Sequence, residues 1–276
     1  MKYEKTEYCL PICPDGARTG RSGCRQYEVV ADSFKGLVRK RNEDSFAFAW
    51  DASETNLLTV VADGIGSTWN GDIAGDYAVR MLVQAWREKQ FPEQMGPEAV
   101  RDFLSDCFCE INHRFFEINQ LPIPEYNRDS LGTTLTAAVF MNGTAVAVNA
   151  GDSPLFRIRD AQVKKITFDH SLANELLRIG QISPDEVNSL AYGRRLTRFI
   201  GPKEVVEPEC YAFDVRRGDY FLICSDGLTL HLTPDEISRM IISSESDLSQ
   251  ALKKLFRRTM LRGAKDNVTA ILVKSL

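Results

Sequence analysis

Residues 57–64 read LLTVVADG, an apolar run that ends on the carboxylate of Asp63 and a glycine. A short run of apolar and β-branched residues of this length is typical of a buried strand. The simplest interpretation of Asp63-Gly64 is a turn, because Asp-Gly commonly ends a strand. A carboxylate held at the edge of a sheet can also bind a metal ion. The rest of the chain decides between these two interpretations.

Acidic residues recur at the ends of other strand-like runs. They are Asp226 in YFLICSDG (220–227), Asp152 in VAVNAGDS (146–153), Asp266 in KDNVTAILV (265–273), and the pair Glu43 and Asp44 in RKRNEDSF (39–46). Several carboxylates at one rim repel one another strongly unless cations lie among them. Oxygen ligands favour Mg²⁺ or Mn²⁺, and the three histidines are not spaced as zinc ligands. Two such ions can generate a hydroxide for in-line attack on phosphorus, so the set predicts two-metal hydrolysis of a phosphate ester.

The composition is that of an ordinary soluble globular protein, with 276 residues, 43% hydrophobic and 26% charged. The net charge of −4 gives no electrostatic footprint for nucleic acid or an anionic membrane. No apolar run approaches the ~18 residues of a membrane helix, and the N-terminus lacks the apolar core of a signal peptide. We therefore expect a cytoplasmic protein that binds neither nucleic acid nor membrane.

The seven cysteines are scattered, and their odd number argues against a complete disulfide framework. Four lie in apolar helix or strand patterns, namely Cys107, Cys109, Cys210 and Cys224. We expect these four to be reduced residues of the core. The other three are Cys9, Cys13 and Cys24. Because a zinc site usually needs four ligands and no histidine lies nearby, we interpret residues 1–25 as an irregular N-terminal extension.

The order of elements predicts one α+β domain over residues 26–276. Strands are expected at 27–33, 44–50, 56–62, on both sides of Asn142-Gly143, at 154–168 as a pair, and at 205–214, 219–225 and 267–273; helices are expected at 72–86, 97–118, from Thr233 and over 246–262. Asn-Gly between alternating runs is a strong hairpin signal. The helices come in adjacent pairs among hairpin-connected strands, so we predict a four-layer αββα sandwich with two antiparallel sheets.

Eight motifs resemble, in order, those of the metal-dependent Ser/Thr protein phosphatases of type 2C (the PPM family), most closely the compact bacterial form. They are GLVRKRNED (36–44), VADGIG (61–66), LGTTLTA (131–137), NAGDS (149–153), DHSL (169–172), LTRFIG (196–201), CSDGLT (224–229) and KDNVTAILV (265–273). The resemblance implies hydrolysis of phosphoserine and phosphothreonine by a metal-bridging hydroxide, without a covalent intermediate. It also implies two or three Mn²⁺ or Mg²⁺ ions as cofactors.

The same resemblance assigns metal ligands residue by residue. Asp63 resembles the carboxylate that bridges both ions, and the carbonyl of Gly64 contacts one of them. Asp226 and Asp266 resemble the remaining ligands of the first ion. Glu43 resembles the ligand of the second ion, largely through water.

Three further residues complete the site that the resemblance implies. Asp44 would orient metal-bound water, and Asp152 resembles a ligand of a third, weaker ion shared with Asp226. Arg39 matches the family's phosphate-binding arginine, a task that suits the planar, permanently charged guanidinium. Because four extended residues span about 13 Å, the chain must bend between Arg39 and Glu43 if both serve one phosphate.

Other polar residues have simpler explanations. For Thr133 and Thr134 we prefer β-strand propensity to a catalytic role. For His170 we prefer a structural hydrogen bond to proton transfer. Eukaryotic relatives place a histidine where this chain has Ile65, which cannot protonate a leaving group. Ser67 and Pro154 also depart from the usual motifs, without touching a ligand side chain.

The expected partners are phosphorylated Ser/Thr proteins, and the enzyme is expected to oppose a bacterial-type Ser/Thr kinase as a monomer. Residues 171–195 correspond to the family's variable flap beside the active site. Two alternatives stay open: a non-catalytic scaffold of the same fold, and a dedicated regulator phosphatase of an anti-sigma-factor antagonist. The scaffold is disfavoured because Glu43, Asp63, Asp226 and Asp266 are all present.

Overall fold

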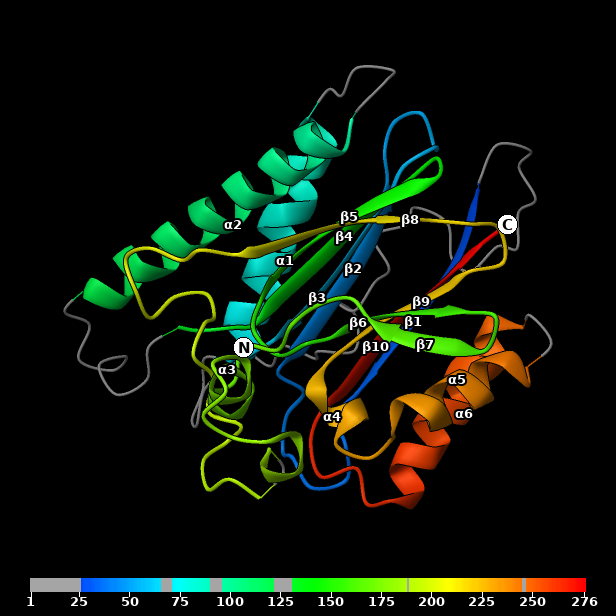
Figure 1. Ribbon diagram of the computed structural model, residues 1–276. Helices are drawn as coiled ribbons and strands as arrows, with labels where there is room; N and C mark the ends of the chain where they lie inside the picture. The colour runs from blue at the N-terminus through cyan, green and yellow to red at the C-terminus, as the bar shows by residue number, and fades with distance from the viewer. Residues whose placement is uncertain (1–25, 66–70, 90–95, 122–130, 188, 245–246) are drawn as a thin grey trace.

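The computed structural model describes residues 26–65, 71–89, 96–121, 131–187, 189–244 and 247–276. The N-terminal extension predicted for residues 1–25, with Cys9, Cys13 and Cys24, lies outside the described residues, as does Ser67. The described chain contains two five-stranded sheets with helices on their outer faces (Figure 1).

The first sheet, here called the β3 sheet, is antiparallel throughout. Its strands in spatial order are β2 (Asp44–Trp50), β3 (Leu57–Asp63), β4 (Leu135–Met141), β5 (Thr144–Ala150) and β8 (Glu209–Asp214). The predicted hairpin at Asn142-Gly143 is confirmed, since Met141 pairs with Thr144 across the turn and Gly143 has a positive φ of 74°.

The second sheet, here called the β10 sheet, is also antiparallel. Its strands in spatial order are β1 (Tyr27–Phe34), β10 (Val268–Ser275), β9 (Tyr220–Cys224), β6 (Leu155–Arg159) and β7 (Gln162–Lys165). The first and last described strands, β1 and β10, pair along their whole length, so the two ends of the domain close one sheet.

Paired helices cover the outer face of each sheet (Figure 1). They are α1 (Gly71–Glu88) and α2 (Pro97–Gln120) on the β3 sheet, and α5 (Pro234–Ile242) and α6 (Leu248–Leu261) on the β10 sheet. Two shorter helices, α3 (Leu172–Arg178) and α4 (Asp226–Thr229), lie in connections. The predicted αββα sandwich is therefore confirmed. Among the described helices, none is long and apolar enough to cross a membrane.

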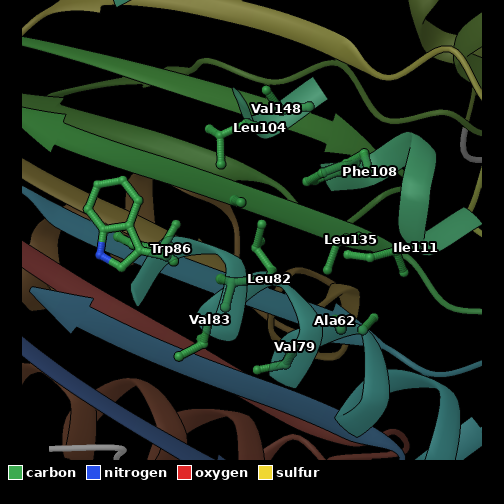
Figure 2. Packing of buried hydrophobic residues seen from close by; sticks show 14 of the residues in the cluster. Ala62, Val79, Leu82, Val83, Trp86, Leu104, Phe108, Ile111, Leu135 and Val148 are labelled. Atoms are coloured by element: carbon green, nitrogen blue, oxygen red, sulfur yellow. The ribbon is translucent and has the colours of Figure 1, made fainter. Parts of the chain in front are cut away.

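The strand quoted first is apolar without alternation because both of its faces are buried. Leu58, Val60 and Ala62 face the helices α1 and α2, whereas Leu57 and Val61 face the other sheet. Figure 2 shows the helix side of this packing, where side chains of α1 and α2 meet those of the β3 sheet. The strand end at Asp63 is therefore anchored by core on two sides.

Some sequence expectations were wrong in detail. Strand β8 covers only Glu209–Asp214 of the predicted 205–214, because Pro208 cannot donate to a strand ladder. By contrast, Ser183 and Glu186 form a capping box at the start of a short 3₁₀ helix, Pro184–Glu186. Cys224 is a buried core thiol as expected, but Cys109 and Cys210 are exposed. Both lie at the exposed boundary between α2 and β8, where Cys210 Sγ lies 3.3 Å from Ser105 Oγ and Cys109 Sγ lies 3.8 Å from the carbonyl oxygen of Val206.

Candidate active site at the edge where the two sheets meet

Strand ends from both sheets bring the predicted carboxylates together. Asp44 begins β2 and Asp63 ends β3, and the two are paired directly in the sheet register. Asp226 follows β9 and opens α4, while Asp266 lies just before β10. The charges of Asp226 and Asp266 act on both Asp44 and Asp63, so the four side chains form one electrostatic cluster.

Burial of negative charge dominates this cluster. Burial raises the pKa of Asp44 to about 7, and Asp226 and Asp266 add to the rise, while hydrogen bonds from Ser225 and Thr269 oppose it. The pKa of Asp63 is also raised well above its ordinary value, first by burial and then by Asp44. Without cations the described site therefore cannot hold all of these groups ionised at neutral pH.

The cluster extends to Asp152, which follows β5. Burial raises the pKa of Asp152 to about 8, with Asp226 and then Asp169 contributing. Burial likewise raises the pKa of Asp226 to about 6, with Asp266 adding to it and the arginines Arg194 and Arg39 opposing it. The charges of Asp152 and Asp226 therefore act on each other within this cluster.

The donors at this edge suit a hard divalent cation that keeps part of its water. One oxygen of Asp44, Oδ2, accepts a hydrogen bond from Ser225 Oγ at 2.7 Å, but the buried Oδ1 has no partner among the described residues. A buried oxygen of this kind normally has a donor, and water on a metal ion would supply one. Within the described chain, no three His, Cys, Asp or Glu side chains are arranged to hold an ion by themselves. Water would complete the shell, as is usual for Mg²⁺.

The chain bends at residues 35–43, as the spacing of Arg39 and Glu43 requires. The segment forms no strand, and Gly36 has a φ of +80°. A Cβ on Gly36 would lie 2.2 Å from the carbonyl oxygen of Asp266, so the bend packs directly on that loop. Arg39 Nη2 donates to Asp266 Oδ2 at 2.7 Å, and its side chain is 47% exposed. The guanidinium of Arg39 therefore lies at the rim of the site, where it contacts both solvent and the carboxylate of Asp266.

Comparison with known proteins identifies the family. The family model of Protein phosphatase 2C matches residues 38–276. The chain belongs to the protein phosphatase 2C family. A serine/threonine phosphatase, stp, of Listeria monocytogenes is 31% identical over 240 residues, which cover 87% of this chain and 92% of the relative.

Solved structures agree with this assignment. The serine/threonine phosphatase of S. agalactiae superposes with a TM-score of 0.83 at 28% identity, covering 91% of this chain and all of its own. The catalytic domain of the phosphatase PstP, in complex with two manganese ions, superposes with a TM-score of 0.74 at 25% identity, covering 90% and 97%. The predicted family, fold and enzyme class, a protein serine/threonine phosphatase, are therefore confirmed.

An asparagine whose role the sequence did not reveal holds together the loops that carry Glu43 and Asp266. Asn267 Oδ1 accepts from the backbone N–H of Glu43 at 2.9 Å, and its Nδ2 donates to the carbonyls of Lys35 and Arg41 at 2.8 Å. Asn267 thus fastens both ends of the Arg39 bend to the loop of Asp266. The asparagine lies within a quoted motif, but its partners are more than 200 residues away in sequence, so no local pattern identified them.

The Asp-Gly pair of the phosphatase is not a turn. Gly64 continues from β3 into an isolated bridge with Thr133, and Asp63 N–H donates to Thr134 Oγ1 at 2.9 Å. Thr133 Oγ1 donates to the carbonyl of Asp63 at 3.0 Å. A Cβ on Gly64 would lie 2.0 Å from the carbonyl oxygen of Gly71, so only glycine fits there. The two threonines position Asp63, a role beyond the strand propensity that the sequence suggested.

His170 has the structural role that we preferred. It is fully buried, and its Nδ1 accepts from the N–H of Gly151 at 3.0 Å, next to Asp152. Since Nδ1 is the acceptor, the neutral ring carries its proton on Nε2, which lies 3.0 Å from Glu209 Oε2. The buried ring of His170 therefore holds the loop that carries Asp152 through the backbone of Gly151.

Proposed function

We propose that this phosphatase hydrolyses phosphoserine and phosphothreonine in proteins with two or three Mn²⁺ or Mg²⁺ ions at the strand-end carboxylates. The proposed ligands are Glu43, Asp63, the carbonyl of Gly64, Asp226 and Asp266, with Asp152 and Asp226 for a third ion. The observation that carries the proposal is the buried carboxylate cluster, whose raised pKa values require compensating cations. The manganese ions in the related PstP structure support the choice of metal.

The ions, Asp44 and Arg39 then have separate tasks. When bound, the ions supply positive charge and acidify water for attack on phosphorus. Asp44 offers its free oxygen, Oδ1, to hold and orient water at the site. Arg39 leaves Asp266 and binds two oxygens of the incoming phosphate, because its half-exposed guanidinium is already at the rim.

Proton delivery to the leaving alkoxide is assigned to solvent. The side chain of Ile65 has no proton to give, and its backbone N–H is already bonded to the carbonyl of Gly132 at 2.8 Å. His170 is buried behind the Asp152 loop and cannot reach a substrate at the surface. Water at the open rim is therefore the proton source.

The remaining assignments concern partners and the segment beside the site. We assign as substrates proteins phosphorylated by a bacterial-type Ser/Thr kinase, and we place the enzyme in the cytoplasm as a monomer. Residues 26–276 act as one catalytic domain, and the segment 171–195 serves as its flap. Helix α3 and the 3₁₀ turn at 184–186 give that segment its own shape, which suits a role in substrate selection.

Hydrolysis of a phosphothreonine peptide tests the proposal. We expect activity with Mn²⁺, none with EDTA, and none in Asp226→Asn. Asp214→Asn is the matched control. Asp214 is an exposed carboxylate at the end of strand β8, away from the carboxylate cluster, and is paired with arginines. Activity that resists both EDTA and Asp226→Asn would contradict the metal mechanism. Inactivity of the wild-type chain with every divalent metal would instead favour the scaffold alternative.

A further inference from the structure

Helices α5 and α6 lie on the outer face of the β10 sheet (Figure 1), and side chains of both helices line an open groove. We call it the α5–α6 groove. Its volume is about 430 Å³, and it is lined by Glu236, Arg239 and Met240 of α5 and by Lys254, Arg257, Arg258 and Leu261 of α6. Four of these seven side chains are cationic and one is acidic, although the whole chain carries a net charge of −4. The groove is therefore a local concentration of positive charge.

The cations of the groove are not neutralised by the chain itself. Lys254 Nζ donates to the carbonyl of Ser243 at 3.0 Å, and Arg239 Nε donates to the carbonyl of Asp235 at 3.2 Å. Arg257 and Arg258 are exposed. None of the four forms an ion pair with another described residue, whereas arginines elsewhere on the surface are commonly paired with carboxylates.

The single acid at the groove, Glu236, offsets only part of this charge. Hydrogen bonds from Arg262 lower the pKa of Glu236 to about 2, so it is ionised and occupied. It also accepts from the backbone N–H of Thr233 at 3.1 Å, as part of the cap of α5. The carboxylate of Glu236 is thus used within the fold, and the positive potential of the groove faces outward.

The groove also offers apolar contact. Leu261 is 71% exposed, and Met240 is partly buried in the wall. Exposed apolar side chains within a charged surface mark interaction sites when they line a concave feature. The combination fits a peptide that carries several carboxylates and one apolar side chain.

A short chain of contacts links the groove to the active site. Arg262, which binds Glu236, also donates to the carbonyl of His231. His231 Nε2 in turn accepts from the backbone N–H of Lys265 at 3.2 Å, directly before Asp266. Hydrogen bonds through Arg262 and His231 therefore connect the Glu236 end of the groove to the loop that carries a proposed metal ligand.

We propose that the α5–α6 groove docks an acidic segment of the phosphoprotein substrate, with an apolar side chain against Met240 and Leu261, while the phosphoresidue occupies the active site. This inference rests on the proposed function for the identity of the partner. The cations of the groove bind the carboxylates, and such contacts raise the rate of encounter and set the orientation of the bound protein.

Binding can be measured without catalysis. The probe is a fluorescent, non-phosphorylated peptide rich in Asp and Glu with one leucine, and the readout is anisotropy. We expect saturable binding that weakens with salt and falls at least tenfold in R257E/R258E, or about 1.4 kcal/mol. K203E/R217E is the matched control, because it changes net charge equally at two exposed residues outside the groove. R257Q/R258Q, with thermal unfolding of every variant, separates lost charge from lost folding.

Three results would overturn the docking proposal. One is absence of binding at low salt, and another is equal weakening by the control variant. The third is binding of phosphatidylserine vesicles in place of the peptide, which would assign the groove to a membrane surface.

A kinetic experiment tests the docking proposal separately from the proposed phosphatase activity. We compare phosphothreonine peptides with and without the acidic segment, and we expect the segment to lower KM in the wild type and not in R257E/R258E. Equal KM values for two hydrolysed peptides would refute docking and uphold the phosphatase. If neither peptide were hydrolysed, the proposed function would fail, and the anisotropy result would still decide whether the groove binds acidic peptide.

Discussion

Two groups of carboxylates in this phosphatase have opposite surroundings. At the meeting edge of the sheets, burial raises the pKa of Asp44 to about 7, and the nearest charges are other carboxylates. At the far edge, hydrogen bonds from Arg159 lower the pKa of Asp214 to about 2. Asp219, which is 1% exposed, accepts from Arg159 Nε at 2.7 Å and Nη2 at 2.6 Å. Arginines of the chain compensate the far-edge carboxylates directly, whereas Asp44 in the cluster has other carboxylates acting on it.

The largest effect is expected from a substitution in the carboxylate cluster at the edge where the two sheets meet. In Asp63→Asn the proposed bridging ligand loses its charge, and metal ions contribute several kcal/mol of transition-state stabilisation. We expect kcat/KM for a phosphothreonine peptide to fall by about 10³-fold or more. Mn²⁺ affinity, measured by calorimetry, should fall with it. Asp219→Asn, the same chemical change in the arginine-paired group, should retain metal binding; equal loss in both variants would erase the distinction between the groups.

The pH dependence of stability should also differ between the groups. The metal-free fold keeps protons on Asp44, Asp152 and Asp226 up to pKa values of about 7, 8 and 6, while the unfolded chain releases them near pH 4. The native state then binds more protons, so stability falls as pH rises from about 4 to about 8. The slope is about 1.4 kcal/mol per pH unit for each retained proton.

Urea unfolding at pH 6 and pH 8 in EDTA checks this expectation. Saturating Mn²⁺ should flatten the slope, because cations take the place of the protons. Asp214 contributes no slope between pH 6 and pH 8, since its pKa lies at about 2. A metal-free chain whose stability rises from pH 6 to pH 8 would contradict the assigned repulsion.

Replacing aspartate by asparagine is expected to change stability in opposite directions in the two groups of carboxylates. Asp219→Asn removes a buried charge that accepts two hydrogen bonds from Arg159 and one from the N–H of Arg216, so unfolding free energy should drop by about 1.5–3 kcal/mol. In EDTA, Asp63→Asn relieves repulsion and should raise the unfolding temperature. Calorimetric scans of both variants without metal give the comparison, and destabilisation by Asp63→Asn would show that the cluster is not under electrostatic strain.

Local patterns predicted the parts of this molecule that depend on nearby residues. The hairpin at Asn142-Gly143, the capped start of α5 at Thr233 and the buried strand before Asp63 all follow from short-range chemistry. The candidate ligands were found for the same reason, since each stands at the end of a strand-like run and in a motif of the family.

Contacts between distant segments escaped prediction. Asn267 binds the Arg39 bend from the other end of the chain, and Thr134 holds Asp63 across 71 residues. The exposure of Cys109 was missed because it lies beside the stripe of α2 that buries Phe108 and Ile111, not on that stripe. The groove cations lie on two helices, and neither helix alone shows that they line one concavity.

The smallest effect is expected at the exposed member of the arginine-paired group. Asp214 is about half exposed and pairs with Arg157 and Arg159, and solvent screens such pairs. Asp214→Asn should lower the unfolding temperature less than Asp219→Asn and leave metal affinity unchanged. Raising the salt concentration should shrink the difference between Asp214→Asn and the wild type while leaving that of buried Asp219→Asn in place. If Asp214→Asn were the more harmful, the arginines would hold the sheet edge through Asp214, and burial would not be what separates strong from weak carboxylate pairs in this fold.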